Sequence, residues 1–130
     1  MAQRLLTFAM VLGAIWMMGA CGPQVLQVSE AQSNETVSLR VGSEMEISLA
    51  ANPGTGYGWE VAEVSLGVLE PLGEPVYTAG AAMPGAPGVT TFRFRAVHQG
   101  ESALRLVYRR PWEADKAPEK TFAVTVQVRP

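Results

Sequence analysis

Cysteine and histidine are almost absent from this sequence, and their scarcity excludes several kinds of chemistry. Each occurs once among 130 residues, as Cys21 and His98. One cysteine cannot form a disulfide within the chain, and these two residues cannot supply the usual ligands of a zinc site. His98 stands in a predicted turn, where a solvated side chain is typical, so the sequence gives no basis for a Ser-His-Asp triad. We predict no metal site.

The sequence also lacks a strong excess of charge of either sign. Ten basic residues stand against twelve acidic ones, and Arg109-Arg110 is the one basic cluster, which argues against nucleic acid as a partner. No glycine-rich motif leads into a helix that could hold a phosphate. Carboxylate pairs such as Glu44/Glu46 look like solvated strand faces; their spacing leaves a glycosidase pair open, but nothing favours one. We predict a protein that is not an enzyme and uses no cofactor.

A long hydrophobic run occurs only near the start of the chain. A short start ending at Arg4 leads into an apolar segment over residues 5–18, followed by the small residues Gly19-Ala20. This order is typical of a secretory signal peptide, here over residues 1–20. The alternative is a transmembrane anchor, but about 14 apolar residues are fewer than the roughly 20 that a spanning helix needs. We expect the chain to be exported.

Cys21 comes directly after Gly19-Ala20, and this position resembles the processing site of bacterial lipoproteins. At that site, cleavage leaves the cysteine as the first residue, and lipid is attached to it. Met18 stands where the site usually has leucine, and the alternative is an incidental cysteine of the signal peptide. We expect a lipid on Cys21 that anchors the chain to a bacterial membrane, on the periplasmic side or at the cell surface.

The rest of the chain has the pattern of a β protein. Residues 21–34 are polar without clear periodicity, so we expect a tether there, followed by one folded domain over 35–130. Within the domain, apolar residues recur at every second position, which is typical of strands with one face on a core. These segments are residues 36–41, 45–49, 57–61, 89–97, 102–108 and 122–128. Residues 64–76 contain two prolines and are expected to be irregular or an edge strand. About seven strands without a helical period predict an all-β sandwich.

Three loops separate these strands, over residues 50–56, 78–88 and 109–119. In the first loop, a proline and two glycines shape a turn from which Thr55 projects. In the third loop, Trp112 follows a proline beyond the end of a strand, and tryptophan often carries interface energy. Each loop has an ordinary interpretation by itself: a turn, a pliable connector, and a tryptophan folded over the end of the sandwich.

The three loops together carry a resemblance that none of them has alone. Their sequences are Asn52-Pro53-Gly54-Thr55-Gly56-Tyr57, Gly85-Ala86-Pro87-Gly88 and Arg110-Pro111-Trp112. This ordered triple resembles the chagasin family, whose members are protein inhibitors of papain-like cysteine peptidases. The resemblance spans roughly Asn34 to Pro130. It implies an immunoglobulin-like β-sandwich, which agrees with the strand pattern.

The resemblance also implies a mechanism. Three loops at one end of the sandwich would form a wedge that enters the cleft of the peptidase and blocks it reversibly, without covalent chemistry. The loop with Thr55 would lie over the catalytic cysteine and histidine, the loop with Gly88 on the acyl side, and the loop with Trp112 on the leaving-group side. The chain departs from the family pattern at Gly54, which is commonly threonine, and at Pro87, which is commonly glycine. We expect it to act as a monomer.

A second hypothesis keeps the same fold but changes the ligand. A lipid-anchored sandwich could bind a glycan or another ligand through its aromatic side chains, Tyr57, Trp59 and Trp112. A buried Trp59 would weaken the second hypothesis, and a peptidase titration would decide between the two.

Overall fold

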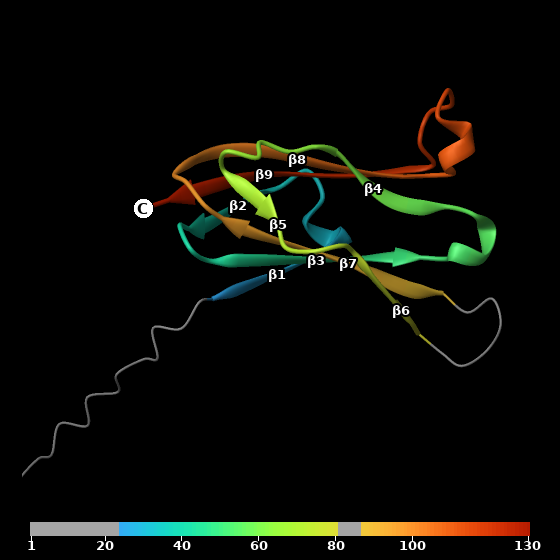
Figure 1. The fold of residues 1–130 in the computed structure, drawn as a ribbon, viewed down its shortest axis with the longest axis horizontal. Helices are drawn as coiled ribbons and strands as arrows, with labels where there is room; N and C mark the ends of the chain where they lie inside the picture. The colour runs from blue at the N-terminus through green and yellow to red at the C-terminus, as the bar shows by residue number, and fades with distance from the viewer. Residues whose placement is uncertain (1–23, 81–86) are drawn as a thin grey trace, which may run out of the picture.

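The computed structural model describes residues 24–80 and 87–130, and in these ranges the chain folds into two β-sheets packed face to face (Figure 1). The predictions for the signal peptide and for Cys21 lie outside the described residues. Within them, no helix has the length and hydrophobicity that a membrane span requires. The strands are β1 (Val25–Ser29), β2 (Thr36–Arg40), β3 (Glu44–Ala51), β4 (Gly58–Glu63), β5 (Leu69–Pro71), β6 (Val76–Ala79), β7 (Gly88–Ala96), β8 (Gly100–Arg109) and β9 (Lys120–Arg129). The short 3-10 helices are η1 (Glu30–Gln32), η2 (Pro53–Thr55) and η3 (Pro111–Glu113).

The two sheets have a mixed but mainly antiparallel order. The first sheet runs β1-β3-β7-β5, with β6 also paired to β7, and the second runs β2-β9-β8-β4. The pairs β1–β3 and β2–β9 are parallel, and the other pairs are antiparallel. The predicted all-β sandwich is confirmed, with nine strands in the described residues instead of about seven.

The core lies between the sheets and follows from the two-residue period of the strands. β3 buries Met45, Ile47 and Leu49, while the side chains between them point outward. Successive side chains of a strand point to opposite faces, so this alternation places one apolar row inside. Burial of each such side chain contributes about 1.5–3 kcal/mol. The core is completed by Val28, Leu39, Ala51, Trp59, Leu69, Phe92, Phe94, Ala96, Leu104, Leu106, Tyr108, Phe122, Val124, Val126 and Val128.

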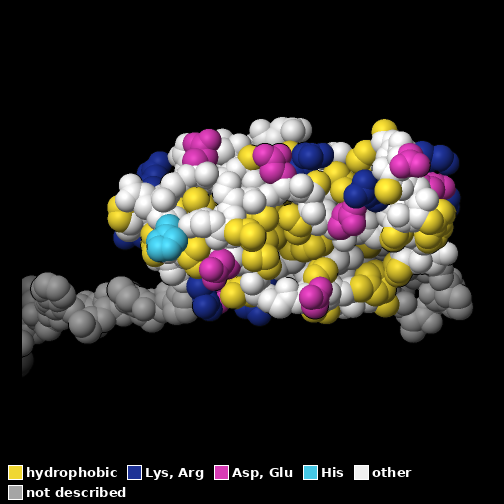
Figure 2. All heavy atoms as spheres, turned by 45° about the horizontal axis from the view of Figure 1, so that its top comes forward, with side chains coloured by type: hydrophobic (Ala, Val, Ile, Leu, Met, Phe, Trp, Pro, Cys, Tyr) yellow, Lys and Arg dark blue, Asp and Glu magenta, His cyan; other side chains and the backbone are white. Residues whose placement is uncertain are grey.

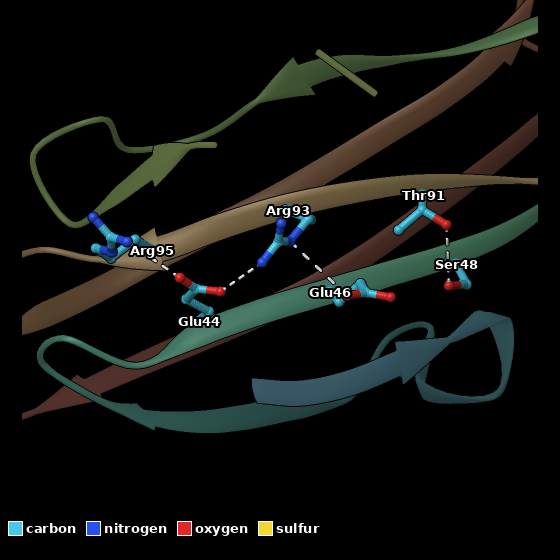
Figure 3. A network of polar contacts seen from close by, with 6 residues as sticks. All are labelled: Glu44, Glu46, Ser48, Thr91, Arg93 and Arg95. Atoms are coloured by element: carbon cyan, nitrogen blue, oxygen red, sulfur yellow. Dashed lines mark hydrogen bonds and ion pairs between the residues drawn. The ribbon is translucent and has the colours of Figure 1, made fainter. Parts of the chain in front are cut away.

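The outer face of β3 and β7 carries a network of charged side chains (Figure 3). The Glu44 carboxylate accepts hydrogen bonds from Arg93 at 2.8 Å and from Arg95 at 3.1 Å. Glu46 lies 3.9 Å from the Nε of Arg93. The hydrogen bond from Arg95, followed by that from Arg93, holds the pKa of Glu44 below its ordinary value, against the opposing effect of desolvation. The positions between the core residues therefore face water, as expected.

The predicted tether over residues 21–34 is wrong for the part that the structure describes. β1 forms five registered pairs with β3, and Val28 is buried in the core with 2% of its surface exposed. Leu26 also packs against the core. The strand was not predicted because only two apolar side chains face inward, too few to show a period among polar neighbours. The domain therefore begins about ten residues earlier than expected, at β1.

The second loop is shorter than predicted. β6 enters the expected loop 78–88 and pairs with the first residues of β7, although all four of its side chains are exposed. Without a buried face, β6 has no apolar alternation in its sequence. β5 lies within residues 64–76 and forms the edge of the first sheet, one of the two expected alternatives.

The sandwich has two different ends (Figure 1). The connections β3–β4 and β8–β9 and the described residues that flank the β6–β7 connection lie at one end, which we call the loop end. The start of β1, the β2–β3 turn, the β7–β8 connection and the end of β9 lie at the other, the far end. β3 joins the two ends over eight residues, which is about 27 Å at 3.4 Å per residue.

Candidate functional site

The first loop is a compact turn held by its own backbone. Pro53 begins η2, and the N–H of Gly56 donates to the Pro53 carbonyl at 3.0 Å. Gly56 closes the turn with φ of 81°, a left-handed conformation that favours glycine. The Thr55 hydroxyl donates to the Asn52 carbonyl at 2.7 Å. This leaves Gly54 and Thr55 exposed at the tip, with no buried side chain in η2.

A stack of aromatic rings supports this loop from below. The ring centroids of Tyr57 and Tyr108 are 5.3 Å apart, and those of Trp59 and Tyr108 are 5.1 Å apart. The Tyr108 hydroxyl accepts a hydrogen bond from the backbone N–H of Asn52 at 3.0 Å. Trp59 has 8% of its surface exposed and donates its indole N–H to the Ala50 carbonyl at 2.9 Å. The stack fixes the loop to the end of β8.

The third loop places an indole ring directly on the first. Pro111 begins η3, and Trp112 follows with 70% of its surface exposed. A β-carbon built at Gly56 would collide with the ring of Trp112, so that ring occupies the space that a side chain at Gly56 would need. Position 56 therefore has room only for glycine while the indole ring of Trp112 lies in this place, although the two residues are far apart in the sequence.

Arg110 joins the two loops. Its Nε donates to the Thr55 carbonyl at 3.0 Å. Its guanidinium carbon lies 4.5 Å from the ring centroid of Tyr57 and 5.9 Å from that of Trp112, both within the range of a cation–π contact. The ion pair with Glu113 at 3.5 Å holds the guanidinium from the other side. We therefore interpret Arg110 as a residue that positions the loops as one unit.

The second loop is described only where it joins the strands. Gly85 and Ala86 lie outside the described residues, Pro87 is exposed, and Gly88 is buried at the start of β7. A β-carbon at Gly88 would collide with the carbonyl of Thr78 and with the ring of Tyr77. Gly88 is therefore required by packing. Tyr77, with 40% of its surface exposed, lies on it and was not predicted, since nothing in its sequence context marks this contact.

The surface of the loop end mixes apolar side chains with charges of both signs (Figure 2). Arg109 pairs with Glu60, and Lys116 lies 3.5 Å from Glu113. His98 lies between β7 and β8, at the far end. Among residues 24–80 and 87–130, no three side chains of types that ligate metals come together. The described part of the loop end presents a shaped surface of mixed polarity.

The structure thus brings together the predicted residues of the first and third loops. These are Asn52, Pro53, Gly54, Thr55, Gly56, Tyr57, Arg110, Pro111 and Trp112. Pro87 and Gly88 lie at the same end of the sandwich, at the start of β7, which pairs with β3 up to Ala51. Trp59 belongs to the core beneath the loops.

Comparison with known proteins agrees with this geometry. The family model described as Chagasin family peptidase inhibitor I42 matches residues 38–126. Amoebiasin-1 of Entamoeba histolytica is 34% identical over 108 residues, which cover 80% of this chain and 100% of the relative. Chagasin of Trypanosoma cruzi is 29% identical over 105 residues, which cover 75% of this chain and 93% of the relative.

Solved structures show the same fold. The cysteine protease inhibitor EhICP2 from Entamoeba histolytica superposes with a TM-score of 0.71 at 24% identity, covering 83% of this chain and 100% of that chain. PbICP-C, solved in complex with falcipain-2, superposes with a TM-score of 0.57 at 21% identity, covering 82% of this chain and 99% of that chain. The immunoglobulin-like sandwich expected from the resemblance is confirmed. From the family match and the shared length, this chain belongs to the chagasin family of peptidase inhibitors.

Proposed function

We propose that this chain inhibits papain-like cysteine peptidases by inserting its loop end into the active-site cleft. One observation carries the proposal most directly: Arg110 and the contact between Gly56 and Trp112 combine the first and third loops into a single projecting surface. The falcipain-2 complex of PbICP-C, the inhibitor EhICP2 and the match to the peptidase-inhibitor family support this class of partner.

The proposed mechanism is steric. The tip at Gly54 and Thr55 would lie over the catalytic cysteine and histidine of the peptidase, and Trp112 would pack on the leaving-group side. The second loop, which includes Pro87 and Gly88, would run along the acyl side. The contacts that join the first and third loops exist before binding, so those contacts need not be ordered when the peptidase associates. We expect the blockade to be reversible, as the resemblance to the family implies.

The hypothesis of a glycan-binding module loses support in the structure. It required Trp59, Trp112 and Tyr57 as a shared aromatic surface. Trp59 is buried and its indole N–H is bonded to the Ala50 carbonyl, while Tyr57 is covered by Tyr108 on one side and by Arg110. Only Trp112 of the three offers a largely exposed ring.

We also propose that the inhibitor acts while attached to a bacterial membrane through lipid on Cys21, as a monomer. The sequence supports this through the apolar segment 5–18 and the small pair before Cys21. The position of the domain start supports it as well, because β1 begins at the far end and leaves the loop end accessible.

A titration with papain tests the proposed inhibition. The purified domain 22–130 should reduce papain activity in competition with a small active-site substrate, and it should remain uncut after long incubation. If the degree of inhibition did not fall as the substrate concentration rises, a mechanism other than blockade of the active site would be indicated. Stoichiometric cleavage of the domain, or no inhibition of several papain-like enzymes, would contradict the proposal.

A further inference from the structure

The far end of the sandwich contains a hollow with an unusual lining. It has a volume of about 460 Å³ and lies between the start of β1, the end of β2 and the end of β9. Arg40 and Arg129 line it, together with the polar residues Gln24, Ser38 and Ser43 and the apolar residues Val25, Leu26, Leu39 and Pro130. No carboxylate side chain is among the described residues that line the hollow. The lining therefore offers hydrogen-bond donors and positive charge to an anion.

The two arginines are direct neighbours across the β2–β9 pair. Arg40 and Arg129 are registered partners, so their backbones are separated by one strand spacing, about 4.8 Å. Like charges in such a position repel and destabilise a sheet. Within residues 24–80 and 87–130, neither arginine has an ion-pair partner, whereas Arg93, Arg95, Arg105, Arg109 and Arg110 each have one. An external anion would relieve this repulsion.

Apolar side chains flank the arginines at the same end. Val25 begins β1 and lines the hollow, and Val41 follows Arg40 and donates its backbone N–H to the Arg129 carbonyl at 2.9 Å. Both valine side chains are exposed. Exposed apolar groups beside arginines are typical of surfaces that lie at the boundary between lipid headgroups and water.

The far end lies close to the proposed lipid anchor, and this position indicates which kind of anion the hollow would bind. Three residues lie between Cys21 and Val25, the first residue of β1. The four residue-to-residue steps span at most about 14 Å when fully extended. A lipid on Cys21 would therefore hold the far end within reach of the headgroups. The loop end would lie roughly 27 Å farther from the bilayer, because β3 spans that distance between the two ends.

We propose that the hollow between Arg40 and Arg129 binds the phosphate of an anionic phospholipid headgroup and seats the far end of the domain on the membrane. This inference rests on the proposed export and anchoring, and it adds a second, electrostatic attachment to the lipid on Cys21. It fixes the orientation of the inhibitor, with its loops directed away from the bilayer toward a soluble peptidase.

Vesicle sedimentation tests the headgroup site without the anchor. The domain 22–130 is suitable because the described core lies entirely between Val28 and Val128. At low ionic strength, it should sediment with vesicles of phosphatidylglycerol and phosphatidylcholine but not with phosphatidylcholine alone. The variant Arg40→Gln/Arg129→Gln should bind about 30-fold more weakly, which is about fivefold for each arginine near an anionic surface. Papain inhibition by this variant should equal that of the wild type, since the loop end is unchanged.

A matched control uses two arginines of the outer face of β7. Arg93→Gln/Arg95→Gln removes the same charge from the same domain, but it should retain vesicle binding because these side chains pair with Glu44. Equal binding by the wild type and Arg40→Gln/Arg129→Gln, or equal binding to both vesicle types, would overturn the proposal. A second measurement is hydrogen exchange at the Arg40 and Arg129 amides with inorganic phosphate added. If phosphate protected these amides while the domain bound no vesicles, the hollow would be a site for a free anion, and the proposal would also be overturned.

Discussion

Trp112 has the largest exposed fraction among the large apolar side chains of the described residues. Its ring is already held against Gly56 and beside Arg110, so it loses little freedom when a partner covers it. Such preordered tryptophans often act as interface hot spots. We expect Trp112→Ala to weaken papain inhibition by about 2 kcal/mol or more and to change the melting temperature little. Inhibition constants and thermal melts measure the two effects.

Trp59 provides the contrasting control for this prediction. It is buried and supports the first loop through Tyr108, so Trp59→Ala should lower stability by about 3–5 kcal/mol, as large-to-small core substitutions do. If Trp112→Ala instead produced the large loss of stability, its ring would be acting as a core residue, and its assignment to the binding surface would be wrong.

Gly54 is a residue at which affinity can be gained. It lies in η2 without a positive φ, and a β-carbon there would meet only the Asn52 Oδ1, at an ordinary 3.4 Å. Replacing a glycine at compatible angles stabilises by about 0.4–1 kcal/mol, because fewer conformations are lost on ordering. We expect Gly54→Thr to tighten inhibition by up to about 1 kcal/mol, mainly through slower dissociation. Stopped-flow or surface-binding kinetics measure the dissociation rate.

The same replacement at Gly56 should have the opposite effect. Gly56 has φ of 81°, and a side chain there collides with Trp112, so Gly56→Thr strains the turn and displaces the ring.

Faster dissociation of the Gly54→Thr complex, with the turn intact, would contradict the prediction for Gly54. It would show that the conformational entropy of the first loop does not limit affinity.

At the scale of elements, the pairing of β3 with β7 predicts a dependence of stability on pH. The hydrogen bonds from Arg95 and Arg93 lower the pKa of Glu44 in the folded state, relative to about 4.3 in an unfolded chain. The stabilisation is therefore present above the unfolded value and is lost as the pH falls through the lowered folded pKa. We expect Glu44→Gln to be less stable than the wild type at neutral pH, with the difference shrinking below about pH 4. Melting temperatures across this range measure the effect.

Glu46 serves as the comparison for Glu44. Its carboxylate is 3.9 Å from the Arg93 Nε and forms no hydrogen bond to it. Glu46→Gln should therefore have little effect on the melting temperature at any pH. A constant gap between the wild type and Glu44→Gln down to pH 3 would contradict a role for the Glu44 charge.

The elements that the sequence predicts well are those that bury one face. β3, β7, β8 and β9 each place several apolar side chains on the core, and their two-residue period follows directly. β1 and β6 were missed because their stability comes from backbone pairing with β3 and β7 more than from an apolar face. A short strand with little or no buried face shows no clear two-residue alternation of apolar side chains, so its sequence does not mark it as a strand.

The candidate site could be predicted only in part, for a similar reason. Prolines in the first and third loops and glycines in the first mark turns, and the ordered triple of loop sequences carries the resemblance to the family. The contact between Gly56 and Trp112 and the hydrogen bond from Arg110 to Thr55 depend on how two distant loops meet at the loop end. The spacing of residues along the chain does not predict this contact between the loops, so the positioning role of Arg110 is seen only in the folded structure.

At the scale of the whole molecule, the proposed attachment and the proposed inhibitory surface lie at opposite ends of the sandwich. We expect the wild-type chain to partition into detergent and Cys21→Ser to stay in the aqueous phase, because the described residues contain no apolar helix that could replace the lipid. Phase separation with Triton X-114, after removal of the signal peptide, measures the partition.

Inhibition of papain by both forms is the control for this anchoring prediction. The loop end is remote from β1, so Cys21→Ser should inhibit as strongly as the wild type. If both forms stayed in the aqueous phase, lipid attachment at Cys21 would be excluded while the inhibitory role stood unaffected.

The parallel pairing of β1 with β3 also determines how the molecule bears tension. A peptidase bound at the loop end would pull on the final residues of β3, and the proposed lipid anchor would pull on the first residues of β1. Because the two strands run in the same direction, these forces slide one strand past the other. The load then falls on all five registered pairs, from Val25↔Glu44 to Ser29↔Ser48, at the same time. The ladder resists this shear as a unit, with a rupture force set by the whole strand and not by its weakest hydrogen bond.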